Sequence, residues 1–101
     1  MLLTKANRKA LPALYTQDGK GDDAIAHVKF FTPDAGATWY ATEFDGDDTF
    51  FGYCDLGLGF PELGYFSLTE LQSVRGKFGL PVERDRYYSP TTLATIKGEG
   101  A

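Results

Sequence analysis

Lysine and arginine are absent from the middle of this chain. The 101-residue sequence has ten of them, but none lies between Phe30 and Val74. This window holds eight of the 14 acidic residues: Asp34, Glu43, Asp45, Asp47, Asp48, Asp55, Glu62 and Glu70. The window therefore carries a formal charge of −8, and the flanks, with ten basic and six acidic residues, carry +4. This segregation favours a cationic partner and disfavours direct binding of nucleic acid, because phosphate backbones are bound by Lys and Arg.

Cysteine and long apolar runs are also scarce. Cys54 is the only cysteine, which excludes an intramolecular disulfide and leaves too few thiolates for a typical zinc site. No apolar run approaches the roughly 20 residues of a membrane span, and Lys5 interrupts the N-terminal apolar residues before they reach the length of a signal sequence. We therefore expect a cytoplasmic protein that does not enter a membrane.

The content of hydrophobic residues indicates a folded chain. Hydrophobic residues make up 43% of the sequence and aromatic residues 15%, more than a disordered acidic tail contains. A chain of this length supports one ordinary hydrophobic core. The expectation is a single domain over residues 1–101.

Two or three short helices are expected. Thr4 is a suitable N-cap for a helix over residues 5–11, which Pro12 limits. Ser67 and Glu70 match a capping box, and Gly76 stands where that second helix would end. Residues 89–96 predict a last helical turn.

The remaining periodic segments predict an antiparallel sheet. Residues 24–31 alternate between apolar and polar, residues 38–44 and 49–54 flank the hairpin dipeptide Asp45-Gly46, and residues 62–66 follow a glycine-rich crossing at 56–61. Residues 80–88 predict a further strand at an edge. The fold class is therefore α+β, with a small antiparallel sheet of about four to five strands and two or three short helices.

Exposed aromatic side chains beside acids suggest a protein interface. Strand alternation sends Trp39 and Tyr40 to opposite faces of the sheet, so that some aromatic rings are exposed unless a helix covers each face. Tyr and Trp commonly anchor protein interfaces, including those of homodimers. The candidate residues for binding a partner are Trp39, Glu43, Asp45, Asp47, Asp48, Tyr53, Asp55 and Glu62.

The same acids also suggest a metal site or a small enzyme. Hard cations take several carboxylate oxygens, but the sequence does not fit an EF-hand, because Phe50 and Leu56 replace its glycine and its bidentate glutamate. We assign no metal, cofactor or catalytic residue, and the protein is expected not to be an enzyme. A small carboxylate-based or metal-dependent enzyme and a homodimeric scaffold are the alternatives.

Imitation of nucleic-acid phosphates requires several acidic segments to combine. Alternate residues on one face of a strand lie about 6.6 Å apart, whereas duplex DNA carries one charge per roughly 1.7 Å of its axis. A surface that competes with DNA or RNA must therefore gather carboxylates from several strands or loops onto one exposed side.

The chain resembles a family of small bacterial proteins known only as a domain of unknown function. The resemblance is carried by TWYATEFDGDDTFFG at residues 38–52 and PELGYFSLTEL at residues 61–71, and it extends from LTKAN at 3–7 to LPVERD at 80–85. It implies residence on plasmids, integrative elements and phages. Together with the acidic window, it leads to the hypothesis of a mobile-element accessory protein that binds a basic bacterial protein. The most concrete form is an anti-CRISPR-type inhibitor that covers the nucleic-acid-binding surface of a CRISPR effector subunit or other defence nuclease.

Overall fold

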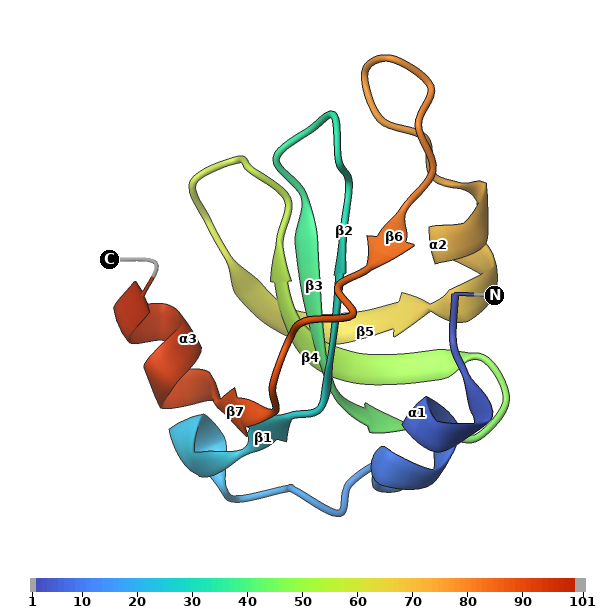
Figure 1. The fold of residues 1–101 in the computed structure, drawn as a ribbon. Helices are drawn as coiled ribbons and strands as arrows, with labels where there is room; N and C mark the ends of the chain where they lie inside the picture. Colours follow the sequence, from blue (N-terminus) through green and yellow to red (C-terminus); the bar gives the residue numbers. More distant parts are fainter. Residues whose placement is uncertain (1, 100–101) are drawn as a thin grey trace.

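The computed structural model describes residues 2–99, which form an α+β fold with a five-stranded antiparallel sheet (Figure 1). The predicted fold class is confirmed. The elements in chain order are α1 (Lys5–Ala10), the 3₁₀ helix η1 (Gly21–Asp23), β1 (Ile25–Ala26), β2 (Val28–Phe31), β3 (Thr38–Phe44), β4 (Thr49–Asp55), β5 (Glu62–Ser67), α2 (Leu68–Ser73), β6 (Glu83–Arg84), β7 (Thr91–Thr92) and α3 (Leu93–Glu99).

The main sheet is an antiparallel meander extended at one side. Its strand order is β5-β4-β3-β2-β6, so β5 and β6 are its edges, while β1 and β7 form a separate two-stranded sheet. The predicted hairpin joins β3 to β4, with Phe44 opposite Phe50 and a register shift between Ala41 and Glu43. β3 matches the predicted strand over residues 38–44. β4 extends the prediction by one residue, to Asp55.

One face of the sheet carries the larger core. Phe30 and Phe50 are fully buried there, and the Phe50 ring stacks on Phe44 and Phe66 at centroid distances of 4.4 and 5.1 Å. Leu68 and Leu71 of α2 close this face. Burying one such side chain contributes about 1.5–3 kcal/mol, so this aromatic stack is a major source of stability.

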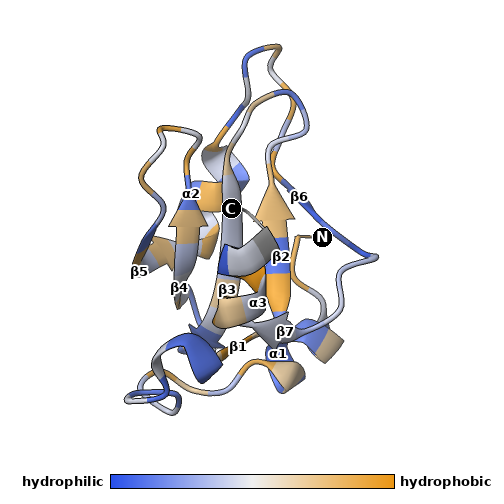
Figure 2. Cartoon of the chain, turned by 90° about the vertical axis from the view of Figure 1, so that its left-hand side faces the viewer, coloured by the Kyte–Doolittle hydropathy of each residue, from blue (hydrophilic) through white to orange (hydrophobic). Residues whose placement is uncertain are grey.

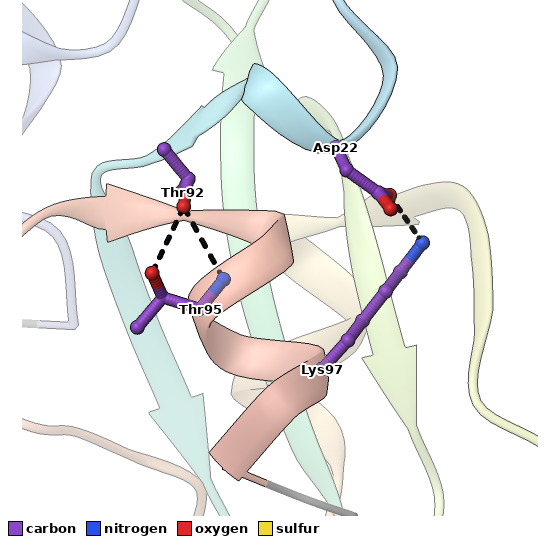
Figure 3. A network of polar contacts seen from close by, with 4 residues as sticks. All are labelled: Asp22, Thr92, Thr95 and Lys97. Atoms are coloured by element: carbon purple, nitrogen blue, oxygen red, sulfur yellow. Dashed lines mark hydrogen bonds and ion pairs between the residues drawn. The ribbon is translucent and has the colours of Figure 1, made fainter.

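The opposite face is covered by α3. Leu93 and Ile96 pack with the half-buried rings of Tyr40 and Tyr53. The Thr92 hydroxyl accepts a hydrogen bond from the Thr95 amide, and Lys97 pairs with Asp22 at 2.6 Å, which ties α3 to η1 (Figure 3). Each face of the sheet therefore has a helix against it, and this accounts for aromatic residues on both faces.

Three boundaries differ from the sequence-based expectation. The strand predicted over residues 24–31 divides at His27, because β1 turns away to pair with β7 while β2 stays in the main sheet. α2 ends at Ser73, before Gly76, because Val74 is already extended with ψ 138°. The strand predicted over 80–88 is reduced to Glu83–Arg84.

The predicted helices near the two chain ends are both present. Thr4 caps α1 as predicted, and its hydroxyl accepts from the Asn7 amide. The predicted turn over 89–96 becomes α3, which begins at Leu93 and continues to Glu99. Within residues 2–99, the helices are too short or too polar to cross a membrane.

Three loops project from the same end of the sheet (Figures 1 and 2). They join β2 to β3, β4 to β5, and α2 to β6. A Cβ at Gly36 would lie 3.7 Å from Gly57, which places the first two loops in contact, and Asp34 joins the first loop to the third through the Phe78 and Leu80 amides. The side chains of Leu58, Phe60 and Phe78, carried by the second and third loops, are more than 70% exposed.

Candidate binding groove

Most acids of the base-free window have a role inside the molecule. Five of the eight accept hydrogen bonds from main-chain amides: Asp34, Glu43, Asp45, Asp48 and Asp55. The two ion pairs within residues 2–99, Lys29 with Asp85 and Lys97 with Asp22, use acids outside the window. Amide dipoles rather than basic side chains therefore compensate much of the window's charge.

Glu43 is buried and fixes the N-terminal loop. Its side chain accepts from the amides of Tyr15 at 2.9 Å and Gln17 at 2.7 Å, and the residue is 4% exposed. Tyr15 has a φ of 71°, a backbone conformation that costs a bulky residue free energy. The prediction that Glu43 faces a partner is wrong, because its carboxylate is turned inward to the loop.

The β3–β4 turn uses two of its three aspartates as acceptors. Asp45 accepts from the amides of Asp47, Asp48 and Thr49, and these bonds lower its pKa. Asp48 accepts from the Ser67 hydroxyl and from the Thr69 hydroxyl and amide, which lowers its pKa and ties the turn to the start of α2.

A cation also reaches this turn. Arg8 of α1 donates from Nη1 to the Gly46 carbonyl at 3.3 Å, and its guanidinium lies 5.4 Å from the Phe44 ring centroid. Asp47 is exposed, and its carboxylate makes no hydrogen bond or ion pair within the described chain. Of the three aspartates in this turn, Asp47 is therefore the one whose carboxylate is left to solvent.

The acids do not gather into one patch. Asp45, Asp47 and Asp48 lie before the start of β4 and Asp55 lies at its end, seven residues or roughly 20 Å away. Asp55 accepts from the Gly57 amide and Asp34 from the Phe78 amide. The requirement of a single exposed acidic surface is therefore not met, because strand β4 separates the two groups.

The predicted aromatic anchors are only partly accessible. Trp39 is 7% exposed, because it points into the larger core, opposite Cys54. Tyr53 is half-buried under α3, with the Lys97 ammonium 5.5 Å from its ring centroid. Trp39 is thus corrected to a core residue that meets a groove at its margin, and Tyr53 to a contact of α3.

A groove of about 650 Å³ follows the β5 edge, and we call it the β5 groove. Its margins come from the loop between β4 and β5, from β5 itself and from the first turn of α2. Its lining residues are Trp39, Cys54, Leu56, Leu58, Phe60, Glu62, Leu63, Gly64, Tyr65, Phe66 and Glu70. In Figure 2 the loop between β4 and β5 carries hydrophobic segments, coloured orange, and it is this loop that supplies the apolar margin.

The β5 groove combines apolar lining with uncompensated negative charge. Glu62 and Glu70 are both exposed, and within residues 2–99 neither carboxylate has a hydrogen bond or an ion pair. The lining of the groove contains no lysine or arginine. A ligand with apolar groups and a positive charge therefore matches this surface.

Two residues of the groove bear on how it can be probed. A Cβ added at Gly64 would meet nothing within 4 Å, so a side chain at this position begins in open space. Burial raises the pKa of the Cys54 thiol to about 11, which keeps it protonated and a poor nucleophile at neutral pH.

The metal hypothesis finds no donor set among residues 2–99. The structure brings no group of three or more His, Cys, Asp or Glu side chains into a metal-binding arrangement in that range. Glu43 turns inward, and Asp45 and Asp48 spend their oxygens on amides and hydroxyls. Of the four acids between residues 43 and 48, three are thus engaged within the chain, and Asp47 alone has no hydrogen bond or ion pair among residues 2–99.

Sequence reasoning missed part of the groove. Glu70 was interpreted as a helix cap, and the alternating apolar residues of Leu56, Leu58 and Phe60 as an irregular crossing. The sequence signal that could have indicated the groove was the apolar content of this crossing. Three large apolar side chains in an irregular segment form an exposed apolar surface, and such surfaces often mark binding sites.

Comparison with known families identifies a match over nearly the whole chain. The family described as "Protein of unknown function (DUF2958)" matches residues 2–97. The chain belongs to DUF2958. Membership covers every element from α1 to most of α3 and includes the whole β5 groove. No curated protein and no solved structure matches this DUF2958 chain.

Proposed function

We propose that this DUF2958 protein is a non-enzymatic accessory protein that binds a basic protein through the β5 groove. The supporting observation is the pairing of large exposed apolar side chains with two free carboxylates in a groove of about 650 Å³. Apolar anchors supply affinity at protein interfaces, and charge complementarity selects the partner and speeds association.

In this proposal the β5 groove, and not the whole acidic window, is the surface that binds the partner. Glu62 keeps its predicted function as a contact for the partner. Glu70, Leu58 and Phe60 join it, and Glu43 and Trp39 leave the set because they are buried. Asp55 lies at the adjoining end of β4 and contributes negative potential.

The most concrete form of this proposal is an anti-defence inhibitor of the anti-CRISPR type, carried by a mobile element. Its support is the base-free acidic window together with the implied residence on plasmids and phages. A groove of this shape favours capture of one basic segment of a CRISPR effector or defence nuclease over imitation of a long phosphate backbone, which requires denser negative charge.

The binding test uses two variants of equal charge change. In Glu62→Lys/Glu70→Lys both groove carboxylates are reversed. In the control Asp23→Lys/Glu83→Lys the reversed acids are exposed residues of η1 and of β6, the opposite edge of the main sheet. Each raises the formal net charge from −4 to 0, since each replacement adds two charges. Immobilised proteins are exposed to bacterial lysate and eluted with rising salt.

We expect wild type and control to retain the same basic protein and to release it as ionic strength rises. The groove variant should bind this protein at least about tenfold more weakly, a loss of about 1.4 kcal/mol in binding free energy. Equal retention by both variants would contradict the groove as the binding surface.

The anti-defence form has its own test in cells. Expression of the wild-type protein in a strain with active CRISPR immunity should raise the establishment of a targeted plasmid, and the groove variant should not. No protection by wild type in strains with different defence systems would remove this form, while the lysate test would still decide the binding.

A further inference from the structure

The β5 groove opens on the core face of the sheet and reaches the β5 edge, because Trp39 of β3 and Cys54 of β4 line it together with β5. Its lining includes the consecutive residues from Glu62 to Phe66. Successive side chains of a strand point to opposite faces, so Glu62, Gly64 and Phe66 lie on the core face and Leu63 and Tyr65 on the other. A lining that includes residues of both faces borders the edge of β5 as well as the core face. An edge exposes main-chain donors and acceptors as well as side chains.

We infer that the partner contributes an extended basic segment that adds to β5 as a sixth strand of the main sheet. This inference rests on the proposed function, because it specifies how the β5 groove holds its ligand. Main-chain hydrogen bonds along β5 would supply affinity, and alternate side chains of the added strand would enter the groove, as in other cases of β-strand addition.

β5 lacks the devices that usually protect an edge. It has six residues, pairs with β4 through six successive residue pairs without a register shift, and contains neither lysine nor proline. Within the described chain, β4 is its only neighbour in the sheet. Proteins normally protect such an edge with bulges, inward charges, short strands or covering segments.

The opposite edge of the same sheet is protected. β6 has two residues, and the chain before it is bridged between Arg75 and Pro81. Arg84 of β6 is turned inward, where its Nε donates to the Leu2 carbonyl at 3.1 Å. The contrast singles out β5 as the edge that is open to pairing.

The charge at the groove selects the occupant. Glu62 stands at the start of β5 and Glu70 follows its end, so both ends of an added strand lie beside a free carboxylate. A second copy of this chain, paired antiparallel about a two-fold axis through β5, would bring Glu62 of one copy toward Glu70 of the other. Like charges in such a seam repel, so a segment with Lys or Arg at its ends is favoured over a homodimer.

The test uses synthetic peptides because it separates strand pairing from groove binding. The probe is the blocked heptapeptide Lys-Val-Thr-Leu-Thr-Val-Lys. The first control replaces both lysines by glutamate. The second is methylated at the amide nitrogens of two adjacent central residues, which removes a donor on each edge of the peptide strand while keeping its charge and side chains. Binding is followed by NMR on isotope-labelled full-length protein, together with amide hydrogen exchange of residues 62–67.

If the inference holds, the basic peptide binds, slows exchange of alternate amides in residues 62–67, and loses about tenfold or more in affinity on methylation. The glutamate peptide should not bind. Equal binding of the methylated peptide without protection of β5 would overturn strand addition and leave the proposed groove function standing.

Two other outcomes overturn more. One outcome would overturn both the inference and the proposed function. In that outcome neither the basic nor the methylated peptide binds, and the groove variant and its control retain the lysate partner equally. Protection of β5 that rises with protein concentration alone, with a mass increase in light scattering, would assign the edge to a second copy and overturn the basic segment.

Discussion

The β3–β4 strand pair and the β5 edge hold acids of the same kind in opposite states. At the β3–β4 pair, Glu43, Asp45 and Asp48 each accept at least two hydrogen bonds from within the chain. At the β5 edge, Glu62 and Glu70 have none among residues 2–99 and stand beside exposed apolar side chains. An acidic residue becomes available to a partner only where no main-chain amide lies within its reach, which sequence charge alone does not reveal.

The largest difference between the two regions should appear at two paired glycines. Gly52 and Gly64 face each other across β4 and β5, but a Cβ at Gly52 would lie 1.9 Å from the Tyr40 carbonyl oxygen, whereas at Gly64 it meets nothing within 4 Å. We expect Gly52→Ala to lower the free energy of unfolding by about 3 kcal/mol, because main-chain atoms must separate. Gly64→Ala is the matched control and should leave stability unchanged or slightly raised. Urea denaturation measures both, and a similar loss in the two variants would break the contrast.

The second difference concerns the carboxylates. In Glu43→Gln, the side-chain amide group must face an N–H donor of Tyr15 or Gln17, which leaves a buried donor without an acceptor. We expect a loss of about 2 kcal/mol in the free energy of unfolding. Glu62→Gln has no such partner and should stay within about 0.5 kcal/mol of wild type. If both substitutions prove equally mild, Glu43 is not the anchor of the N-terminal loop.

The third difference concerns the rate at which Cys54, the single thiol of the groove, is alkylated. With the pKa of Cys54 raised to about 11, the thiolate is about 100-fold rarer than in a thiol of the ordinary pKa 9.0. The greater nucleophilicity of a high-pKa thiolate offsets part of this, so alkylation at neutral pH should be about tenfold slower than for a free cysteine. Gly64→Leu should slow it further by filling the groove, and Gly98→Leu, in open space on α3, is the control. Alkylation as fast as that of a free cysteine would place the thiol outside the groove.

The smallest expected effect is the pH dependence of stability that comes from Asp48 in the β3–β4 turn. Hydrogen bonds from Ser67 and Thr69 lower the pKa of Asp48 below its ordinary value. Their stabilising contribution is complete above that ordinary value and is lost as the pH falls through the lowered pKa. Asp48→Asn should therefore reduce the urea midpoint at about pH 7, and the gap to wild type should narrow as the pH falls below the ordinary carboxyl value. A gap that stays constant with pH would show that the charge of Asp48 does not contribute.

The sheet was predictable because its signals are local. Alternation of apolar residues and β-branched or aromatic content identified β3 and β4 nearly to the residue, and the caps at Thr4 and Ser67 were correct because each depends on a hydroxyl and an amide three positions away. The shortened α2 and the divided first strand depend on contacts with distant segments, and their boundaries were accordingly missed.

The candidate site was predictable only in part. The acids were found, but their assignment to a surface failed, because Glu43 meets Tyr15 and Gln17 across more than 25 residues of sequence. The groove depends on the path of the loop from Leu56 to Phe60 and on open space over Gly64, neither of which a linear pattern encodes. Glu62 is the one predicted acid that lines the groove, which follows from its place at the start of β5, and its contact with a partner stays a prediction.

Anchoring loops through their peptide nitrogens has a consequence for how this scaffold tolerates change. Asp34 accepts hydrogen bonds from the Phe78 and Leu80 amides in the loop after α2. Every residue type except proline has such an N–H donor. The exposed side chains at Phe78 and Leu80 are therefore free to vary while the path of the loop persists, whereas Gly76 is fixed, because a Cβ there would collide with the Asp34 carboxylate. A molecule built this way can acquire a different chemical preference at its projecting tips without first having to acquire a different shape.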